Sequence, residues 1–484
     1  MRANGTFGSS RKRPKFRRPS DTLAREKEGI TPRRGTQTRL SRLRRQARLF
    51  PRQFWLLAGG TFFYLAVSAL AFPYTAILIK GRLGVSLAVV GAIMGGTALA
   101  GLPLQLVAGS ASDRFGRRAV MIVCAACEAL MYGGLAFVHG IVPICLLVFC
   151  DRALGWPMFL TASNAMVADL VRPRLRAEGY SLVRLMIGAG EVVGPLVAAG
   201  LLLAGFALRD LFVLAGVGCF VYLCYTLCFL HETRSVRPRR QRRGSPEEEP
   251  TEAFGSPALS ALRRRAQSRR RARGRQGAVG YAQVLRDRRF LAFCAVSLLP
   301  LFCFGQLYAS LPLLVTGYLH IAPATWGLLM SLSALVIVVA QYPSVRAAKR
   351  LDPMFGVAAA SLLFGLGVGL VAFLPASWPL LVAIVMFSLA QALFGPVTST
   401  IVAGMAPVDL RGRYMGAWTL IWIAGQGSLG PILGGVLLEG LGPHASYGLI
   451  IACGLAGAGL YLLLRAPRRA GESERRAAWS EARS

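Results

Sequence analysis

The stretch that decides the fold is "GSASDRFGRR", residues 109–118, which places one acid and three arginines between two apolar runs. The run before it reads "AVVGAIMGGTALAGLPLQLVA", and the run after it reads "AVMIVCAACEALMYGGLAFV". Each run has the length of about 20 largely apolar residues that a helix needs to cross a bilayer. The charged stretch is therefore predicted to be a short loop at a membrane surface, between two spanning helices.

The rest of the chain repeats this alternation of apolar runs and short polar loops. Of its 484 residues, 54% are hydrophobic and only 16% are charged, which indicates a polytopic membrane protein and argues against a set of soluble domains. About twelve runs are long enough to span a bilayer. The predicted spans are residues 53–79, 85–108, 119–138, 141–165, 179–205, 210–230, 290–316, 325–343, 355–374, 379–402, 413–438 and 444–464.

The net charge of +34 is concentrated in an N-terminal tail (residues 1–52), a central linker (233–289) and a C-terminal tail (466–484). An even number of spans between these basic segments puts all three on one side, and the positive-inside rule makes that side cytoplasmic. We therefore expect a plasma-membrane protein, of the bacterial inner membrane, with both termini cytoplasmic. Because no nucleic-acid module is readable in the basic segments, their expected partner is anionic lipid and not nucleic acid.

The two halves of the chain are similar to each other. An offset of about 236 residues aligns Gly81 with Gly317, Met94 with Met330, and Gly194-Pro195 with Gly430-Pro431. Six spans in each half make the halves parallel repeats, an arrangement typical of transporters that rock two bundles around a central site. The predicted fold is thus all-α, with twelve transmembrane helices in two six-helix bundles, residues 53–232 and 290–465.

The charged loop carries a resemblance to a known family. The positions that match the family's loop motif "G-x-x-x-D-R-x-G-R-R" are Gly109, Asp113, Arg114, Gly116, Arg117 and Arg118. The chain resembles the major facilitator superfamily, and within it the twelve-span drug:proton antiporters. This resemblance implies that the loop latches one conformation, with Asp113 acting on the start of span eleven. Asp169 is an expected partner of Arg117 or Arg114. The alternative is that the arginines only enforce topology.

A second motif, "GEVVGPLVAAG" at residues 190–200, lies in span five. It resembles the antiporter pattern "G-x-x-x-G-P-x-x-G-G", except that alanines replace the last two glycines. Gly190 and Gly194 are spaced to form a groove for a close helix partner, and Pro195 is expected to bend the helix. The resemblance favours export. The alternative is tight packing alone, because "GSLGPILGG" at 427–435 repeats the pattern in span eleven.

Ionisable residues inside the predicted spans lie in the first half of the chain. A charged side chain at mid-bilayer costs about 2.5 to 3.5 kcal/mol on insertion scales, so such residues need partners or a water-filled cavity. Asp151, Arg152 and Glu191 are the proton-coupling candidates, and the alternative is a structural ion pair. "DRALG" at 151–155 resembles the family's "R-x-x-Q-G" motif, but its glycine comes one position early and the glutamine is missing.

Adjacent helical residues point about 100° apart, so Asp151 and Arg152 are not expected to face the same cavity. Arg152 is predicted to face substrate, and Asp151 is predicted to turn toward Glu128 or Glu191. Glu128 itself is expected to be structural, because the resemblance places span three at the periphery of the bundle.

The resemblance assigns spans one, four, seven and ten to a central cavity. The predicted lining residues are Phe63, Tyr74, Trp156, Gln306, Tyr308, Trp418 and Trp422. Apolar and aromatic walls with few amides suit hydrophobic or cationic aromatic molecules better than sugars.

The leading hypothesis is therefore a monomeric, proton-coupled exporter of hydrophobic or cationic small molecules, with no cofactor and no metal. One alternative is a proton-coupled symporter for a nutrient or organic anion, with Arg152 as the anchor for a carboxylate. A membrane-embedded transferase is a remote alternative, because the 4 histidines are scattered over helix ends and loops. The absence of "G-x-x-x-x-G-K-[ST]" disfavours a primary pump.

Overall fold

The computed structural model describes residues 50–106, 112, 114–233, 283–348, 352–373 and 377–465. Most of the predicted basic tails and linker fall outside these ranges, and so do Gly109 and Asp113 of the charged loop. A compact unit, Pro51–Ser484, contains the helices described below.

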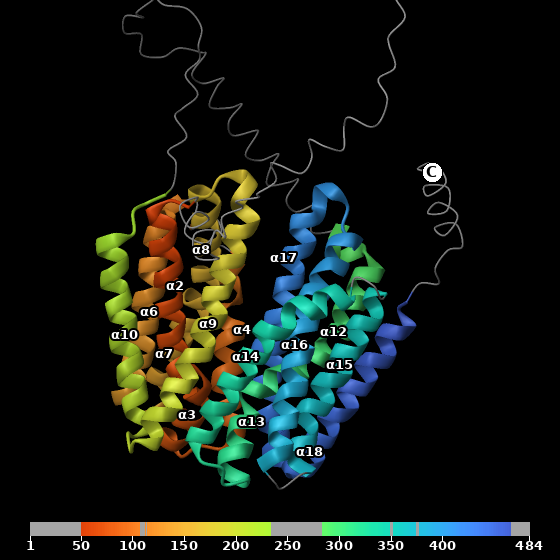
Figure 1. The fold of residues 1–484 in the computed structure, drawn as a ribbon. Helices are drawn as coiled ribbons and strands as arrows, with labels where there is room; N and C mark the ends of the chain where they lie inside the picture. Colours follow the sequence, from red (N-terminus) through yellow and green to blue (C-terminus); the bar gives the residue numbers. More distant parts are fainter. Residues whose placement is uncertain are drawn as a thin grey trace, which may run out of the picture. The chain divides into compact units, whose positions relative to one another are not determined.

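The first half of this unit is a bundle of helices in the order of the predicted spans (Figure 1). Its helices are α2 (Arg52–Ala71), α3 (Thr75–Leu83), α4 (Leu87–Leu106), α6 (Arg117–Phe137), α7 (Ile141–Leu154), α8 (Trp156–Leu170), α9 (Arg176–Leu203) and α10 (Leu208–Phe229). The second half comprises α12 (Arg288–Gly305), α13 (Ser310–Leu313), α14 (Pro323–Ala348), α15 (Pro353–Gly369), α16 (Ser377–Met405), α17 (Arg411–Trp422) and α18 (Gly430–Leu463).

The described residues contain 11 helices that are long and apolar enough to cross a membrane. The last of these, Arg411–Leu463, is 53 residues long, far more than one crossing requires. Within it Gly442 has φ 74° and ψ 174°, which is not helical, and Pro443 follows. The chain turns at this point between two spans, and the predicted twelve-span, all-α fold is confirmed.

Spans one, four and seven are not the continuous helices that the sequence pattern predicts. Span one is interrupted by the 3₁₀ turn Phe72–Tyr74, span four by Gly155, and span seven by the 3₁₀ turn Gln306–Tyr308. Hydropathy alone does not reveal these breaks. Pro73 and Pro157 favour the first two breaks, because they lack an N–H that would donate to the preceding turn, although Pro195 lies inside the continuous helix α9.

Two ends of the molecule are distinguished by the chain path. We call the end at which α2 and α12 begin and α10 and α18 finish the terminal end. At the opposite end, α3 and α9 finish. The halves meet where α4 packs on α18 and α9 packs on α14. Among the described elements, the principal contacts of α8 and α17, which form the terminal-end parts of spans four and eleven, are with helices of their own halves.

Candidate functional site

The breaks in spans one, four and seven come together around two aromatic rings. The guanidinium carbon of Arg152 lies 5.3 Å from the ring centre of Phe72, and that ring lies 5.1 Å from the ring of Tyr308. Tyr308 is in turn within electrostatic range of Glu191 on α9. The Nε atom of Arg152 is buried without a hydrogen-bond partner. Two of the predicted proton-coupling residues thus flank an aromatic contact between the two halves.

Asp151 and Arg152 point to different surroundings. Asp151 is buried at 7% exposure and lies within electrostatic range of Glu128 on α6. Glu128 is 2% exposed and has Cys219 Sγ at 3.9 Å, with the hydroxyls of Tyr64 and Ser68 beside it. Two carboxyl groups therefore share the interior of the first bundle, while the neighbouring arginine lies over Phe72, whose ring contacts Tyr308 of the second half.

The predicted cavity aromatics occupy several different places. Tyr308 and Trp422 both lie against Phe304, at ring distances of 6.3 Å and 5.9 Å, and Trp418 is 6.2 Å from Trp422. These three extend the contact at Phe72 into the second bundle. Trp156 stacks 6.0 Å from Phe159 inside the first bundle.

The remaining cavity candidates divide into one exposed and two buried side chains. Phe63 is 39% exposed. Tyr74 is fully buried, and its hydroxyl lies where a side chain on Gly327 of α14 would be. Gln306 is also fully buried, and it donates hydrogen bonds to the carbonyls of Phe302 and Gly430 at 3.0 Å each. Its amide oxygen accepts from Ser310, so this side chain holds spans seven and eleven together.

The glycines of the span-five motif face span one. A Cβ on Gly190 would meet Leu65 Cβ at 2.7 Å, and one on Gly194 would meet Ala69 Cβ at 2.8 Å. On another side of α9, the carbonyl of Pro195 lies against Gly327 of α14. At the adjacent residues Gly194 and Pro195, α9 therefore contacts span one of its own bundle and α14 of the other half.

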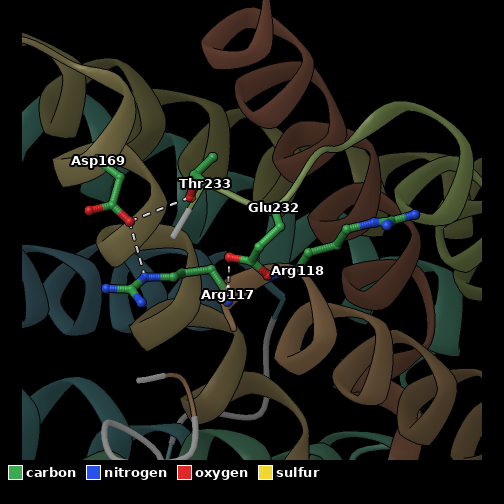
Figure 2. A network of polar contacts seen from close by, with 5 residues as sticks. All are labelled: Arg117, Arg118, Asp169, Glu232 and Thr233. Atoms are coloured by element: carbon green, nitrogen blue, oxygen red, sulfur yellow. Dashed lines mark hydrogen bonds and ion pairs between the residues drawn. The ribbon is translucent and has the colours of Figure 1, made fainter. Parts of the chain in front are cut away.

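The last two residues of the charged loop, Arg117 and Arg118 at the start of α6, belong to a polar network at the terminal end (Figure 2). Arg117 Nε lies 3.1 Å from Asp169 Oδ2, so these two predicted motif residues form an ion pair. Thr233 donates to the same carboxylate at 3.5 Å. Arg114 lies 5.5 Å from the ring of its neighbour Phe115.

Sequence reasoning missed Glu232, which joins this network from just after span six. Its carboxylate accepts from the backbone N–H groups of Arg117 and Arg118, at 3.0 and 3.1 Å, and so caps α6. Gly116 has φ 97°, and a Cβ there would collide with Glu232. Arg118 completes the tie by donating to the carbonyls of Thr226 and Leu227 on α10. An acid directly after an apolar span was the available signal.

Comparison with known families agrees with this architecture. The family model described as Major Facilitator Superfamily matches residues 56–318 and 301–484, and so covers both halves. The chain belongs to the Major Facilitator Superfamily. It is a multi-pass membrane transporter and not an enzyme.

Relatives within this superfamily are named for several different functions. Multidrug resistance protein MdtH of Aeromonas hydrophila is 27% identical, over 79% of this chain and 87% of that protein. A Na(+), Li(+), K(+)/H(+) antiporter of Planococcus maritimus is 22% identical, over 76% of this chain and 85% of that protein. The crystal structure of nucleoside transporter NupG superposes with a TM-score of 0.66 at 14% identity, covering 86% of this chain and 99% of that one. The last comparison bears on the fold alone.

Proposed function

We propose that this transporter exports hydrophobic or cationic small molecules in exchange for protons, by alternating access of its two bundles. The observation that carries the proposal is the contact of Arg152 with Phe72 and of Phe72 with Tyr308, with Glu191 within electrostatic range of Tyr308. It places ionisable groups of the first half beside an aromatic contact between the halves, at the depth where spans one, four and seven are broken. Discontinuous helices are where transporters of many folds bind substrate and coupling ions.

The roles follow from the chemistry of the side chains. A carboxyl group that can exchange one electrostatic partner for another as helices move is able to take up and release a proton. We assign this role to Asp151, with Arg152 as its movable partner, and to Glu191, whose charged neighbour is Arg184. The rings of Tyr308, Trp418 and Trp422 would contact substrate, because aromatic faces attract cations and apolar molecules alike.

Topology and partners belong to the same proposal. We infer that the terminal end is cytoplasmic, because the basic segments adjoin it and positive charge is retained inside. The membrane would be the inner membrane of a bacterium, the protein would act as a monomer, and the basic tails would contact anionic lipid. The relatives named for multidrug resistance and for cation/proton antiport support export with proton exchange.

A second function, uptake of an organic anion with a proton, is favoured by one observation. Arg152 has a buried Nε without a hydrogen-bond partner, which is a ready donor for a carboxylate. Under this alternative, substrate and protons would move in the same direction.

The deciding experiment uses the full chain in liposomes with a pH-sensitive dye trapped inside and an imposed proton gradient. Lipophilic cations, neutral drugs and organic anions are added in turn. Antiport predicts proton movement opposite to substrate for at least one of the first two classes. Movement of protons together with an organic anion would establish the symport alternative, and proton movement with none of the three classes would remove proton coupling.

Two variants locate the coupling groups, and one provides a matched control. We expect Asp151→Asn and Glu191→Gln to reduce substrate-driven proton flux at least tenfold while substrate still binds. The control is Glu178→Gln, which changes an exposed carboxylate in the first turn of α9, the helix that carries Glu191. It should leave the flux unchanged. Wild-type flux in both of the first two variants would refute these assignments.

A further inference from the structure

A carboxylate of the second half reaches the start of a helix in the first half. Glu439 Oε2 on α18 accepts a hydrogen bond of 2.8 Å from the backbone N–H of Ala88, the second residue of α4. Ser86 Oγ accepts from Val89 N at 3.4 Å, so another donor of the same turn is satisfied locally. The first N–H groups of a helix lack partners within the helix, and this end carries partial positive charge. Glu439 thus caps α4 across the boundary between the halves.

Close packing brings the two helices together one turn from this bond. A Cβ on Gly435 would lie 3.2 Å from Ala88 Cα, and one on Gly91 would lie 3.2 Å from both Gly435 Cα and the Pro431 carbonyl carbon. Gly435 and Glu439 are four residues apart and share one face of α18. The glycine admits the α4 backbone, and the carboxylate on the next turn binds that helix's first turn. Lys80 also lies within electrostatic range of Glu439.

Other bonds between the halves near this level involve neutral groups. Trp326 Nε1 donates to the carbonyl of Pro73 at 3.1 Å, and Ser331 Oγ donates to the carbonyl of Val192 at 2.7 Å. The Glu439 bond differs from these in being exposed to solvent and in having an ionised acceptor, which the partial positive charge at the start of α4 attracts. Any motion that separates α4 from α18 at the opposite end has to break the Glu439 bond.

We propose that Glu439 is a gating residue that holds the two halves closed at the end opposite the termini, and that its release accompanies opening there. The device mirrors the predicted role of the charged loop. In that prediction an acid after span two acts on the start of span eleven, whereas here an acid near the end of span eleven acts on the start of span two. The proposal rests on alternating access and needs neither proton coupling nor drug export.

Hydrogen–deuterium exchange of the full chain in nanodiscs, without substrate or proton gradient, tests this role. In Glu439→Ala we expect faster exchange of the amides at 87–91. Exchange should also rise at 323–331, where α14 meets the first half, and fall in the terminal-end helices α8 and α17 as these approach each other. From the strength of a charge at a helix N-terminus, the change in the open-to-closed ratio should be about two- to fivefold.

Two further variants separate a gate from a simple cap. Glu439→Gln keeps an acceptor but loses the charge, and should give a smaller change in the same direction. Asp210→Asn is the matched control, because Asp210 caps its own helix at the same end by accepting from Ala207 N at 2.9 Å. It should affect exchange only at the start of α10. A rise confined to 87–89 in both Glu439 variants, or no change, would overturn the proposal.

Discussion

The two halves of this transporter share a fold but differ in the polar groups they bury. The first half buries Glu128 and Asp151, and the next residue, Arg152, lies over the ring of Phe72. Described residues of the second half bury neutral groups instead, such as Tyr461, which donates to Ser297 at 2.7 Å, and Ser361, which donates to the carbonyl of Gly454 at 3.0 Å. The halves share a packing scheme, and in the described part of the chain the buried carboxyl groups of Glu128 and Asp151 belong to the first half.

The same contrast appears at the terminal end, where each half ties its last span to its third. In the first half the acid, Glu232, comes from beyond span six and caps the start of α6. In the second half the acid is Asp352, which caps its own helix α15, while the base, Arg465, follows span twelve and lies 3.0 Å away. The position is equivalent, but the charges are exchanged. In both halves a charged residue after the last span binds the start of the third span of that half, but the residue is an acid in the first half and a base in the second.

The largest expected effect tests what the halves have in common. A Cβ at Gly194 would lie 2.8 Å from Ala69 Cβ of span one, and a Cβ at Gly430 would lie 2.8 Å from Gly305 Cα of span seven. Because these contacts are equivalent in the repeat, Gly194→Val and Gly430→Val should each destabilise the protein by about 3 kcal/mol or more. Size-exclusion profiles and thermal denaturation in detergent measure this effect.

Gly200→Val is the control for these variants, because nothing lies within 4 Å of a Cβ built at Gly200 on the same helix as Gly194. It should behave as wild type. If Gly194→Val were tolerated and Gly430→Val were not, the packing of the halves would differ as well as their chemistry.

The next prediction tests the difference in chemistry. Asp151→Asn should reduce substrate-driven proton flux at least tenfold with little change in thermal stability, because the amide keeps the shape of the carboxyl group. Tyr461→Phe should do the reverse, since it removes one buried hydrogen bond worth about 1 kcal/mol and no ionisable group of the proposed coupling site. Proton flux in liposomes and thermal denaturation are measured for both. A loss of flux in Tyr461→Phe would show that coupling extends into the second half.

The smallest effect compares the terminal-end ion pairs. The side chains of Arg117 and Asp169 are 15% and 25% exposed, whereas those of Arg465 and Asp352 are 37% and 17% exposed. Solvent screens the second pair more, so double-mutant cycles should give about 1 kcal/mol for the first pair and about half of that or less for the second. Equilibrium unfolding in mixed micelles supplies the values. A stronger Asp352–Arg465 coupling would reverse this order.

Much of the architecture was predictable from the sequence. Run length and composition determined the number of spans, and the self-alignment near an offset of 236 residues indicated the parallel repeat. Placing Asp169 near the same membrane surface as the loop arginines predicted Arg117 or Arg114 as its partner, and the structure shows Arg117. These features depend on the length of the apolar runs and on the positions of the charged residues, both of which can be read directly from the amino-acid sequence.

Only the tertiary structure decided which side chains meet. The contact of Arg152 with Phe72, the capping of α6 by Glu232 and the bond from Ala88 to Glu439 join residues from different spans. Hydropathy is nearly uniform around most of these helices, so it does not reveal which face turns inward or where a span breaks. Those outcomes depend on close approach at particular glycines and prolines and on long-range partners, and the folded chain alone brings these together.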